Sequence, residues 1–322
     1  MEMMDETSSG LLFLFAACCG LLVLATLIGE VLRARLPRTG AHLVVETYLT
    51  RVNSWWGMVF LFSLALLIGP VGIILLFAFC SMAAMREFLT LTTKSKADHW
   101  SLIAAFYVIL PLQYFLIWLG EVGLFSTLIP VYAYLMLPIL SVLRGGNKQT
   151  ADKDFLARIS ETQWGLMICV FCASFIPALV TLDIPGYGDR APMLIAWLVF
   201  VIQMGDLMEY FTGRKFGKRK VAAAVSPKTL EGIGCGAAFA AGLGLLLTWM
   251  TPFSPLMAMV MALIAYMIGV GGSLVMAAIK SDRGIKNWGH LIPGQGGFVD
   301  QLDSVVFAAP IFFHLTRYLY GG

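Results

Sequence analysis

Residues 255–279 read PLMAMVMALIAYMIGVGGSLVMAAI, a run of apolar and small residues without a charged side chain. An α-helix needs about 20 such residues to cross the roughly 30 Å hydrocarbon core of a bilayer. We therefore predict that this run forms a transmembrane helix.

Similar apolar segments recur along the whole chain. They lie approximately at 11–32, 57–68, 70–85, 101–120, 122–143, 163–182, 192–211, 233–250 and 303–320. The chain is 59% hydrophobic and only 13% charged, and its mean hydropathy is +0.83. A soluble domain has about a quarter of its residues charged. We predict an all-α fold, a polytopic transmembrane helical bundle with about 9–10 membrane segments.

Two neighbouring segments leave the path of the chain open. Segment 57–68 is too short to cross a bilayer alone, and Gly69-Pro70 separates it from 70–85. Because proline kinks or breaks a helix, the apolar run is interrupted here. Residues 57–85 form either a re-entrant hairpin or two thin passes.

The basic residues indicate the orientation of the chain. All but two of the 22 Lys and Arg residues lie between segments in alternate loops, and the two exceptions are Arg190 and Arg317. Basic loops stay on the cytoplasmic side of a membrane. We therefore expect both ends of the chain outside and loops 212–232 and 280–302 in the cytoplasm.

The loop at 212–232 follows an apolar helix that ends in acidic residues. Asp206, Glu209 and Tyr210 are spaced to share one helix face, and carboxylates within membrane segments mark functional sites. The run GRKFGKRK at 213–220 suits either anionic lipid headgroups or a polyphosphate. SPKT at 226–229 then begins the next helix, where free N–H groups favour an anion.

The loop at 280–302 leads into the last segment with a second acidic pair. Asp300 and Asp303 are three residues apart, so they share a face of the helix that begins there. Two carboxylates beside lysines and glycines suit Mg²⁺ with a polyphosphate. The first turn of a helix also favours acidic residues without any ligand.

Taken together, the two loops resemble the signature stretches of the CDP-diacylglycerol synthase (phosphatidate cytidylyltransferase) family. GRKFGKRK…SPKTLEG and IKSDRGIKNWGHLIPGQGGFVDQLDS are similar to the family patterns GKxFGKxK…SPxKTxEG and KRxxGIKDxGxxxPGHGGxxDRxDS. The resemblance covers roughly residues 200–310. It implies one membrane domain over 1–322, with helices of uncertain similarity at 11–190 and a catalytic region at 191–322.

The family resemblance also implies an activity. A membrane-bound cytidylyltransferase would convert CTP and phosphatidate, or a related phospholipid, to CDP-diacylglycerol and pyrophosphate with Mg²⁺, and the need for a second, monovalent cation is left open. The expected location is a bacterial inner membrane with the active loops in the cytoplasm. A homodimer is left open as well, and no nucleic-acid partner is expected.

Site residues follow from the resemblance position by position. The implied catalytic residues are Asp300, Asp303, Lys280 and Lys286. The implied metal ligands are Asp300, Asp303 and Asn287. The implied substrate-binding residues are Asp206, Tyr210, Lys218, Lys220, Ser226, Lys228, Thr229, Glu231, Gly294, Gly296 and Gly297.

The chain departs from the family pattern at several polar positions, and these departures keep the activity open. The departures are Ser273 for Asp, Ala277 for Ser, Ser281 for Arg, Asn287 for Asp, Gln295 for His and Gln301 for Arg, and SPKT is one residue shorter than SPxKT. The alternative is a relative without turnover that binds a lipid or a membrane partner. A transporter is disfavoured because the charges gather at one face rather than near the bilayer midplane.

Overall fold

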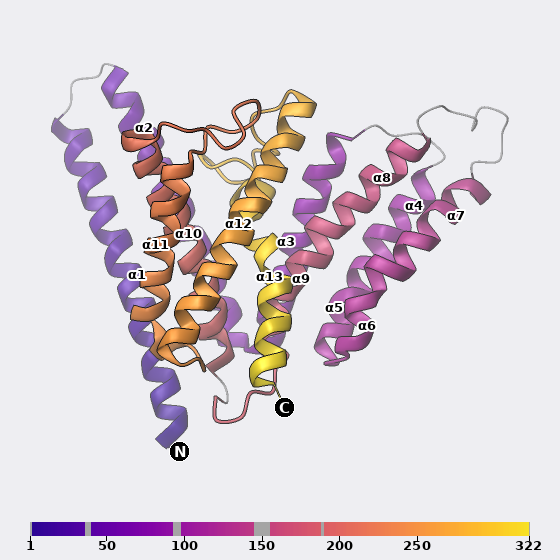
Figure 1. The fold of residues 1–322 in the computed structure, drawn as a ribbon, viewed down its shortest axis with the longest axis horizontal. Helices are drawn as coiled ribbons and strands as arrows, with labels where there is room; N and C mark the ends of the chain where they lie inside the picture. The colour runs from indigo at the N-terminus through magenta and orange to yellow at the C-terminus, as the bar shows by residue number, and fades with distance from the viewer. Residues whose placement is uncertain (1, 36–39, 93–97, 145–154, 188–189, 322) are drawn as a thin grey trace.

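The computed structural model describes residues 2–35, 40–92, 98–144, 155–187 and 190–321. This part of the chain is helical and contains two isolated β-bridges but no strand. The long helices stand roughly side by side and form a bundle (Figure 1). The all-α prediction is confirmed.

The described residues form a series of helices along the chain. Their bounds are α1 Glu2–Arg35, α2 Gly40–Ile68, α3 Pro70–Thr90, α4 His99–Ala104, η2 Ala105–Ile109, α5 Leu110–Trp118, α6 Val122–Thr127, η3 Leu128–Ala133, α7 Tyr134–Arg144, α8 Phe155–Leu166, η5 Met167–Cys172, α9 Ala173–Ala178, η6 Leu179–Thr181, α10 Ala191–Phe216, α11 Leu230–Leu246, η8 Thr248–Met250, α12 Pro255–Arg283 and α13 Phe298–Tyr320.

Eight helical stretches of the described residues are long and apolar enough to cross a membrane. They are Val45–Ile68, Pro70–Thr90, His99–Trp118, Val122–Leu143, Phe155–Thr181, Ala191–Phe216, Pro255–Arg283 and Phe298–Tyr320. Three of these stretches contain a π-helical part, η2, η3 or η5. Helix α11 is apolar but shorter. The predicted polytopic bundle is thus confirmed.

The path of residues 57–85 differs from the expectation. The apolar segment 57–68 is the second half of α2, which begins at Gly40, so this helix is not too short to cross the bilayer. The hydropathy pattern misses the first half because polar residues interrupt it there. The chain turns at Gly69, with a φ of 90°, and Pro70 starts α3. Both helices have the length of full spans, which favours two passes over a re-entrant hairpin.

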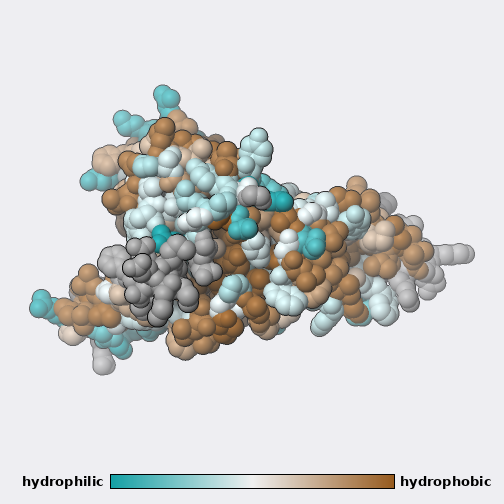
Figure 2. All heavy atoms as spheres, turned by 90° about the horizontal axis from the view of Figure 1, so that it is seen from below, coloured by the Kyte–Doolittle hydropathy of each residue, from teal (hydrophilic) through white to brown (hydrophobic). Residues whose placement is uncertain are grey.

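The connections that carry most of the basic residues lie at one end of the bundle, and both chain termini lie at the other (Figure 1). We call the first end the loop end. Seen from the terminal end, the molecule shows mostly hydrophobic residues with scattered hydrophilic ones (Figure 2). Some of the basic residues used to predict the orientation lie outside the described residues, namely Arg38, Lys94, Lys96, Lys148 and Lys153.

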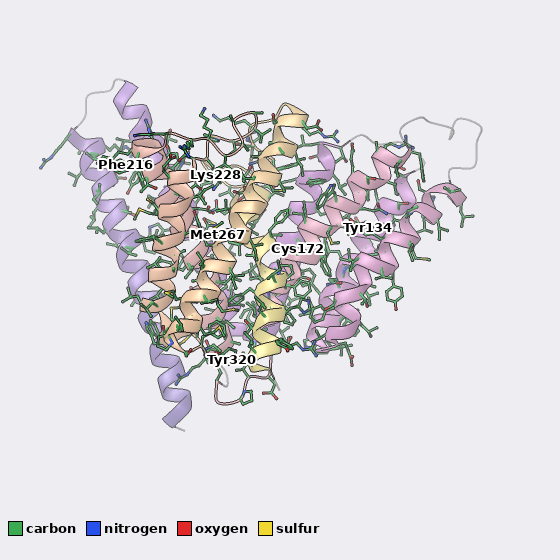
Figure 3. All side chains as sticks on the ribbon, viewed as in Figure 1. Tyr134, Cys172, Phe216, Lys228, Met267 and Tyr320 are labelled. Carbon is green, nitrogen blue, oxygen red and sulfur yellow. The ribbon has the colours of Figure 1, made fainter. Side chains whose placement is uncertain are left out.

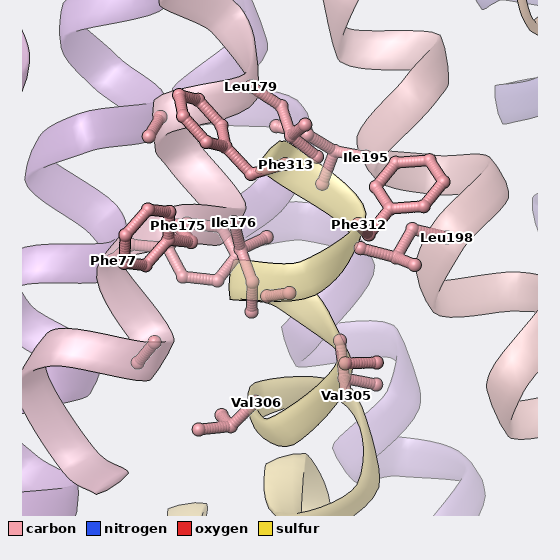
Figure 4. Packing of buried hydrophobic residues seen from close by; sticks show 14 of the residues in the cluster. Phe77, Phe175, Ile176, Leu179, Ile195, Leu198, Val305, Val306, Phe312 and Phe313 are labelled. Carbon is pink, nitrogen blue, oxygen red and sulfur yellow. The ribbon is translucent and has the colours of Figure 1, made fainter. Parts of the chain in front are cut away.

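Helix α13 lies at the centre of the packed core. Phe312 and Phe313 are almost fully buried between α9 and α10, and Val305 and Val306 continue the same packing toward the loop end (Figure 4). Phe313 meets Phe175 edge to face, with ring centroids 5.2 Å apart. The middle of α13 is therefore packed tightly between its neighbours.

Candidate active site

The connection between α10 and α11 is built around Lys228. Its Nζ donates to Asp206 Oδ1 at 3.1 Å and also to Glu209 Oε2. Lys228 lies near the loop end, whereas Tyr320 lies at the opposite end (Figure 3). Burial acts to lower the pKa of Lys228, but the two carboxylates outweigh it, so its pKa lies above the usual lysine value. Lys228 therefore stays charged and ties the loop to α10.

Tyr210 does not join this cluster, although its spacing places it on the same helix face. Its side chain is exposed, and its hydroxyl accepts a hydrogen bond from Arg214 Nη1 at 3.3 Å. The loop itself is shorter than expected, because α10 continues to Phe216 and α11 begins at Leu230.

Two of the expected substrate-binding residues bond to the loop backbone. Glu231 Oε2 accepts from the N–H groups of Lys218 and Arg219 at 3.0 and 3.1 Å. The backbone N–H groups of Glu231 itself, Arg219 and Lys218 lower the pKa of Glu231. Thr229 caps α11 by accepting from the N–H of Gly232 at 3.2 Å.

Two basic side chains of this loop, unlike Lys228, take no part in these bonds. Lys218 and Lys220 are exposed, while Ser226 is buried and accepts from the N–H of Lys228 at 3.3 Å. The geometry leaves the two exposed ammonium groups available for an anion.

The connection between α12 and α13 is organised by Asp300. Lys280 Nζ lies 2.5 Å from Asp300 Oδ1, and Oδ2 accepts from the N–H groups of Trp288 and Gly297 at 2.8 and 2.9 Å. Lys280 belongs to the end of α12, which extends to Arg283, and Asp300 lies in the first turn of α13. Asp300 thus closes the loop onto its own helix.

The loop also binds to α2, which the sequence did not indicate. Arg51 Nε donates to the carbonyl of Gly294, and Ser54 Oγ to the carbonyl of Pro293, both at 2.8 Å. Gln295 Nε2 donates to the carbonyl of Arg51 at 3.1 Å. Gln295, which stands at the family's histidine position, therefore anchors the loop to another helix.

Sequence reasoning missed Glu87, a buried residue near the end of α3. Its Oε2 accepts from the N–H of Val299 at 3.3 Å, and its carboxylate also accepts from the N–H of Phe298. A carboxylate at this place satisfies the free N–H groups at the start of α13 and complements the helix dipole. Its only sequence signal is an acidic residue at the edge of an apolar segment.

The glycines of this loop make room for these protein groups. A Cβ atom on Gly297 would lie 2.2 Å from Glu87 Oε2, and one on Gly296 would lie 2.6 Å from Asp300 Oδ2. Gly294 and Gly296 also have φ values of 74° and 103°, which favour glycine. Contacts within the protein therefore require glycine at positions 296 and 297, whether or not a ligand binds.

Asp303 brings the two loops together. Its Oδ1 accepts from the N–H of Ser304 at 2.8 Å, and its charge interacts with those of Lys280, Asp206 and Lys228. Gln203 Nε2 on α10 donates to the carbonyl of Gln301 on α13 at 3.0 Å. The structure thus unites Asp206, Lys228, Lys280, Asp300 and Asp303 in one group, which we call the charged cluster.

Lys286 and Asn287 lie apart from these bonds. Both side chains are exposed, and neither makes a hydrogen bond or ion pair within the described part of the chain. Ser273, at the family's aspartate position, is buried and donates to the carbonyl of Val270 at 3.0 Å.

The side chains available as ligands limit how a magnesium ion could be bound. Among the described residues, no group of three or more His, Cys, Asp and Glu side chains is arranged to hold a metal ion. Mg²⁺ is commonly bound through one or two carboxylates together with substrate phosphates, however. Asp303 fits this mode, because within the described part of the chain its carboxylate accepts only from the adjacent Ser304, whereas that of Asp300 already has three donors.

Comparison with known proteins gives a family match over most of the chain. A sequence profile described as "Cytidylyltransferase family" matches residues 49–319. A protein of Escherichia coli (strain K12) named "Uncharacterized protein YnbB" is 35% identical over 307 residues, which cover 94% of this chain and 97% of that protein.

Two further relatives carry the name phosphatidate cytidylyltransferase. The protein from Aquifex aeolicus (strain VF5) is 29% identical over 140 residues, 43% of this chain and 53% of its own length. The protein from Pseudomonas aeruginosa is 36% identical over 141 residues, 42% of this chain and 52% of its own length. The chain therefore spans about half the length of these two relatives.

Proposed function

This chain belongs to the cytidylyltransferase family, and we propose that it transfers a cytidylyl group from CTP to phosphatidate or a related phospholipid. The products are CDP-diacylglycerol and pyrophosphate. The observation that carries this proposal is the charged cluster, in which carboxylates and ammonium groups from α10, α12, α13 and the α10–α11 connection meet at one end of an apolar bundle.

The chemistry requires little more than positioning and charge compensation. An oxygen of the lipid phosphate attacks the α-phosphorus of CTP, the bond from that phosphorus to the bridging oxygen breaks, and pyrophosphate leaves. Such transfers depend on alignment of the reacting groups and on stabilisation of the developing negative charge. Lys280 and the exposed Lys218 and Lys220 supply positive charge for the phosphates.

We propose Asp303 as the main protein ligand of Mg²⁺, and the negative charge of Asp206, which acts on Asp303, would add to the attraction for a cation. A bound Mg²⁺ would withdraw charge from the phosphate oxygens. Asp300 is assigned a different role, since it holds Trp288 and Gly297 in place through their N–H groups. Lys228 orients Asp206 through their ion pair.

We further propose that the loop end faces the cytoplasm of a bacterial cell, where CTP is available. The concentration of basic residues in these loops supports this orientation. Phosphatidate would then enter from the membrane, and CTP from the cytoplasm.

The second candidate is a relative that binds a lipid or a membrane partner without turnover. Three departures from the family pattern favour it: Asn287 is uncharged and exposed, Gln295 anchors the loop to α2, and Ser273 bonds to its own helix. In this case the charged cluster would hold a lipid phosphate but would not assemble CTP and Mg²⁺ for reaction.

An assay of the purified protein with CTP, phosphatidate and Mg²⁺ distinguishes the two candidates. Formation of CDP-diacylglycerol by the wild-type protein and its loss in Asp303→Asn would support the transferase. Asp303 is a better target than Asp300, because replacing Asp300 also removes the bonds that shape the loop. Asp183→Asn, an exposed position between η6 and α10, is the matched control and should retain activity. A wild-type protein that makes no product and shows no Mg²⁺-dependent CTP binding would refute the transferase.

A further inference from the structure

A cavity of about 190 Å³ lies beside the charged cluster, and its role is not explained by the contacts described above. It is lined by the ends of α3 and α12, by α8 and by the loop that follows α12. Its lining includes Phe88, Glu161, Trp164, Asp282, Arg283 and Trp288. We call it the α3–α8–α12 cavity.

Aromatic side chains form much of its wall. Trp288 is buried and stacks on Phe88, with ring centroids 4.9 Å apart and planes 20° from parallel. Trp164 lies across from them on α8 and is 45% exposed. Flat aromatic surfaces of this kind suit a planar ring, because every nucleobase has faces that stack on them.

One side of the cavity carries hydrogen-bond donors next to acceptors. The guanidinium of Arg283 forms an ion pair with Glu161, and its Nε lies 3.8 Å from Asp282 Oδ2. A guanidinium has five N–H donors, more than these contacts use. The indole N–H of Trp288 is buried and has no hydrogen-bond partner in the described part of the chain.

This polar side matches the edge of cytosine. Cytosine presents ring N3 and O2 as acceptors beside an exocyclic amino group as a donor, whereas uracil has a carbonyl oxygen in place of that amino group. Arg283 can donate to the acceptors, and a carboxylate can accept from the amino group, as it does in base recognition elsewhere. Uracil would place an oxygen against the carboxylate.

The cavity is also within reach of the charged cluster. Arg283 follows Lys280 by three residues on α12, about 4.5 Å along the helix axis. The backbone N–H of Trp288 donates to Asp300. A nucleotide with its base in the cavity would therefore extend its phosphates toward Lys280 and Asp303.

We propose that the α3–α8–α12 cavity is the base subsite for a cytidine nucleotide, with Trp164 stacking on the ring and Arg283 and Glu161 reading its edge. This inference rests on the proposed function, since it assigns the base of the same CTP. It concerns residues that the signature motifs leave open, because Arg283 and Asp282 occupy unspecified positions of the family pattern.

Nucleotide binding by the detergent-purified full chain tests the proposal without turnover. Equilibrium binding of CTP and of UTP is measured for the wild type and for Trp164→Ala, Glu161→Gln and Trp118→Ala. Trp118 is the matched control, an exposed tryptophan at the C-terminal end of α5. We expect the wild type to prefer CTP. Glu161→Gln should reduce that preference at least about fivefold. Trp164→Ala should weaken the binding of both nucleotides, whereas Trp118→Ala should leave both affinities unchanged.

The outcomes separate the two levels of inference. A wild type that prefers CTP, with the preference and affinity unchanged in Glu161→Gln and Trp164→Ala, would overturn the base subsite and leave the transferase standing. A wild type that binds no CTP would refute the proposed function and the subsite with it. If Glu161→Gln does not fold, as judged by its thermal unfolding, the loss of affinity in Trp164→Ala relative to Trp118→Ala decides.

Discussion

Replacement of Glu87 by leucine should open the loop between α12 and α13 without removing any residue of that loop. The carboxylate of Glu87 accepts from the N–H groups of Phe298 and Val299, and the residue is 6% exposed. Leucine is of similar size but has no acceptor. Both N–H groups would then be buried without a partner unless the first turn of α13 moves.

The structure allows the size of this effect to be worked out. A buried donor left without its acceptor costs about 1–3 kcal/mol, so two such donors cost about 2–6 kcal/mol. Glutamine keeps one carbonyl oxygen and loses the charge. Since a hydrogen bond to an ionised group is roughly twice as strong as a neutral one, Glu87→Gln should cost about 1–2 kcal/mol.

Hydrogen exchange measures this cost at the place where it arises. The amides of Phe298 and Val299 should exchange at least about 30-fold faster in Glu87→Leu than in the wild type, which corresponds to about 2 kcal/mol. Glu121→Leu is the control, because Glu121 is exposed and its side chain does not cap α6. Exchange at these two amides that is unchanged in Glu87→Leu would show that Glu87 does not hold the start of α13.

Three further predictions concern the same end of the bundle. Lys228→Met should destabilise the protein by about 3 kcal/mol, measured by thermal unfolding in detergent, because it leaves two largely buried carboxylates of α10 without their partner; unfolding unchanged from the wild type would contradict this. The stabilising contribution of Lys228 should be fully present below the usual lysine pKa and should be lost only as the pH rises through its raised pKa, so the Lys228→Met difference should not decrease between pH 8 and about 9; a difference that shrinks within this range would count against the ion pairs. Gly297→Ala should destabilise the protein by about 1–3 kcal/mol because its Cβ would meet the Glu87 carboxylate. Gly123→Ala is the control and should have no such effect, since its Cβ meets no atom within 4 Å. Equal unfolding temperatures for the two variants would show that the loop moves to accommodate the added methyl group.

The fold could be predicted from the sequence because most of the apolar segments are long enough to cross a membrane as helices. Segment 255–279 corresponds to α12, Pro255–Arg283. The exception is α2, where Arg51, Asn53 and Ser54 lower the local hydropathy although the helix continues through them. Hydropathy indicates which residues suit lipid, whereas a helix is held together by its backbone hydrogen bonds. The ends of the apolar segment and the ends of the helix therefore differ.

The candidate site was predictable only in part. Helical spacing correctly placed Asp300 and Asp303 in the first turns of α13, but it could not show that they engage different partners. Asp300 bonds to N–H groups of the preceding loop, whereas Asp303 faces the charges of α10 and α12. Glu87 was missed because its partner Val299 is 212 residues away in the chain. No local pattern marks a contact that only packing creates.

The bonds from α2 and α3 to this loop have a consequence for the design of fragments and chimeras. A fragment that begins at residue 191 would contain every signature residue, yet it would lack Arg51, Ser54 and Glu87, which hold the loop from outside. Grafting the two signature loops onto another family member would meet the same difficulty, since the recipient helices would have to supply equivalent partners. The smallest unit that can be exchanged intact is therefore a set of loops together with α2 and α3, although these parts are far apart in the sequence.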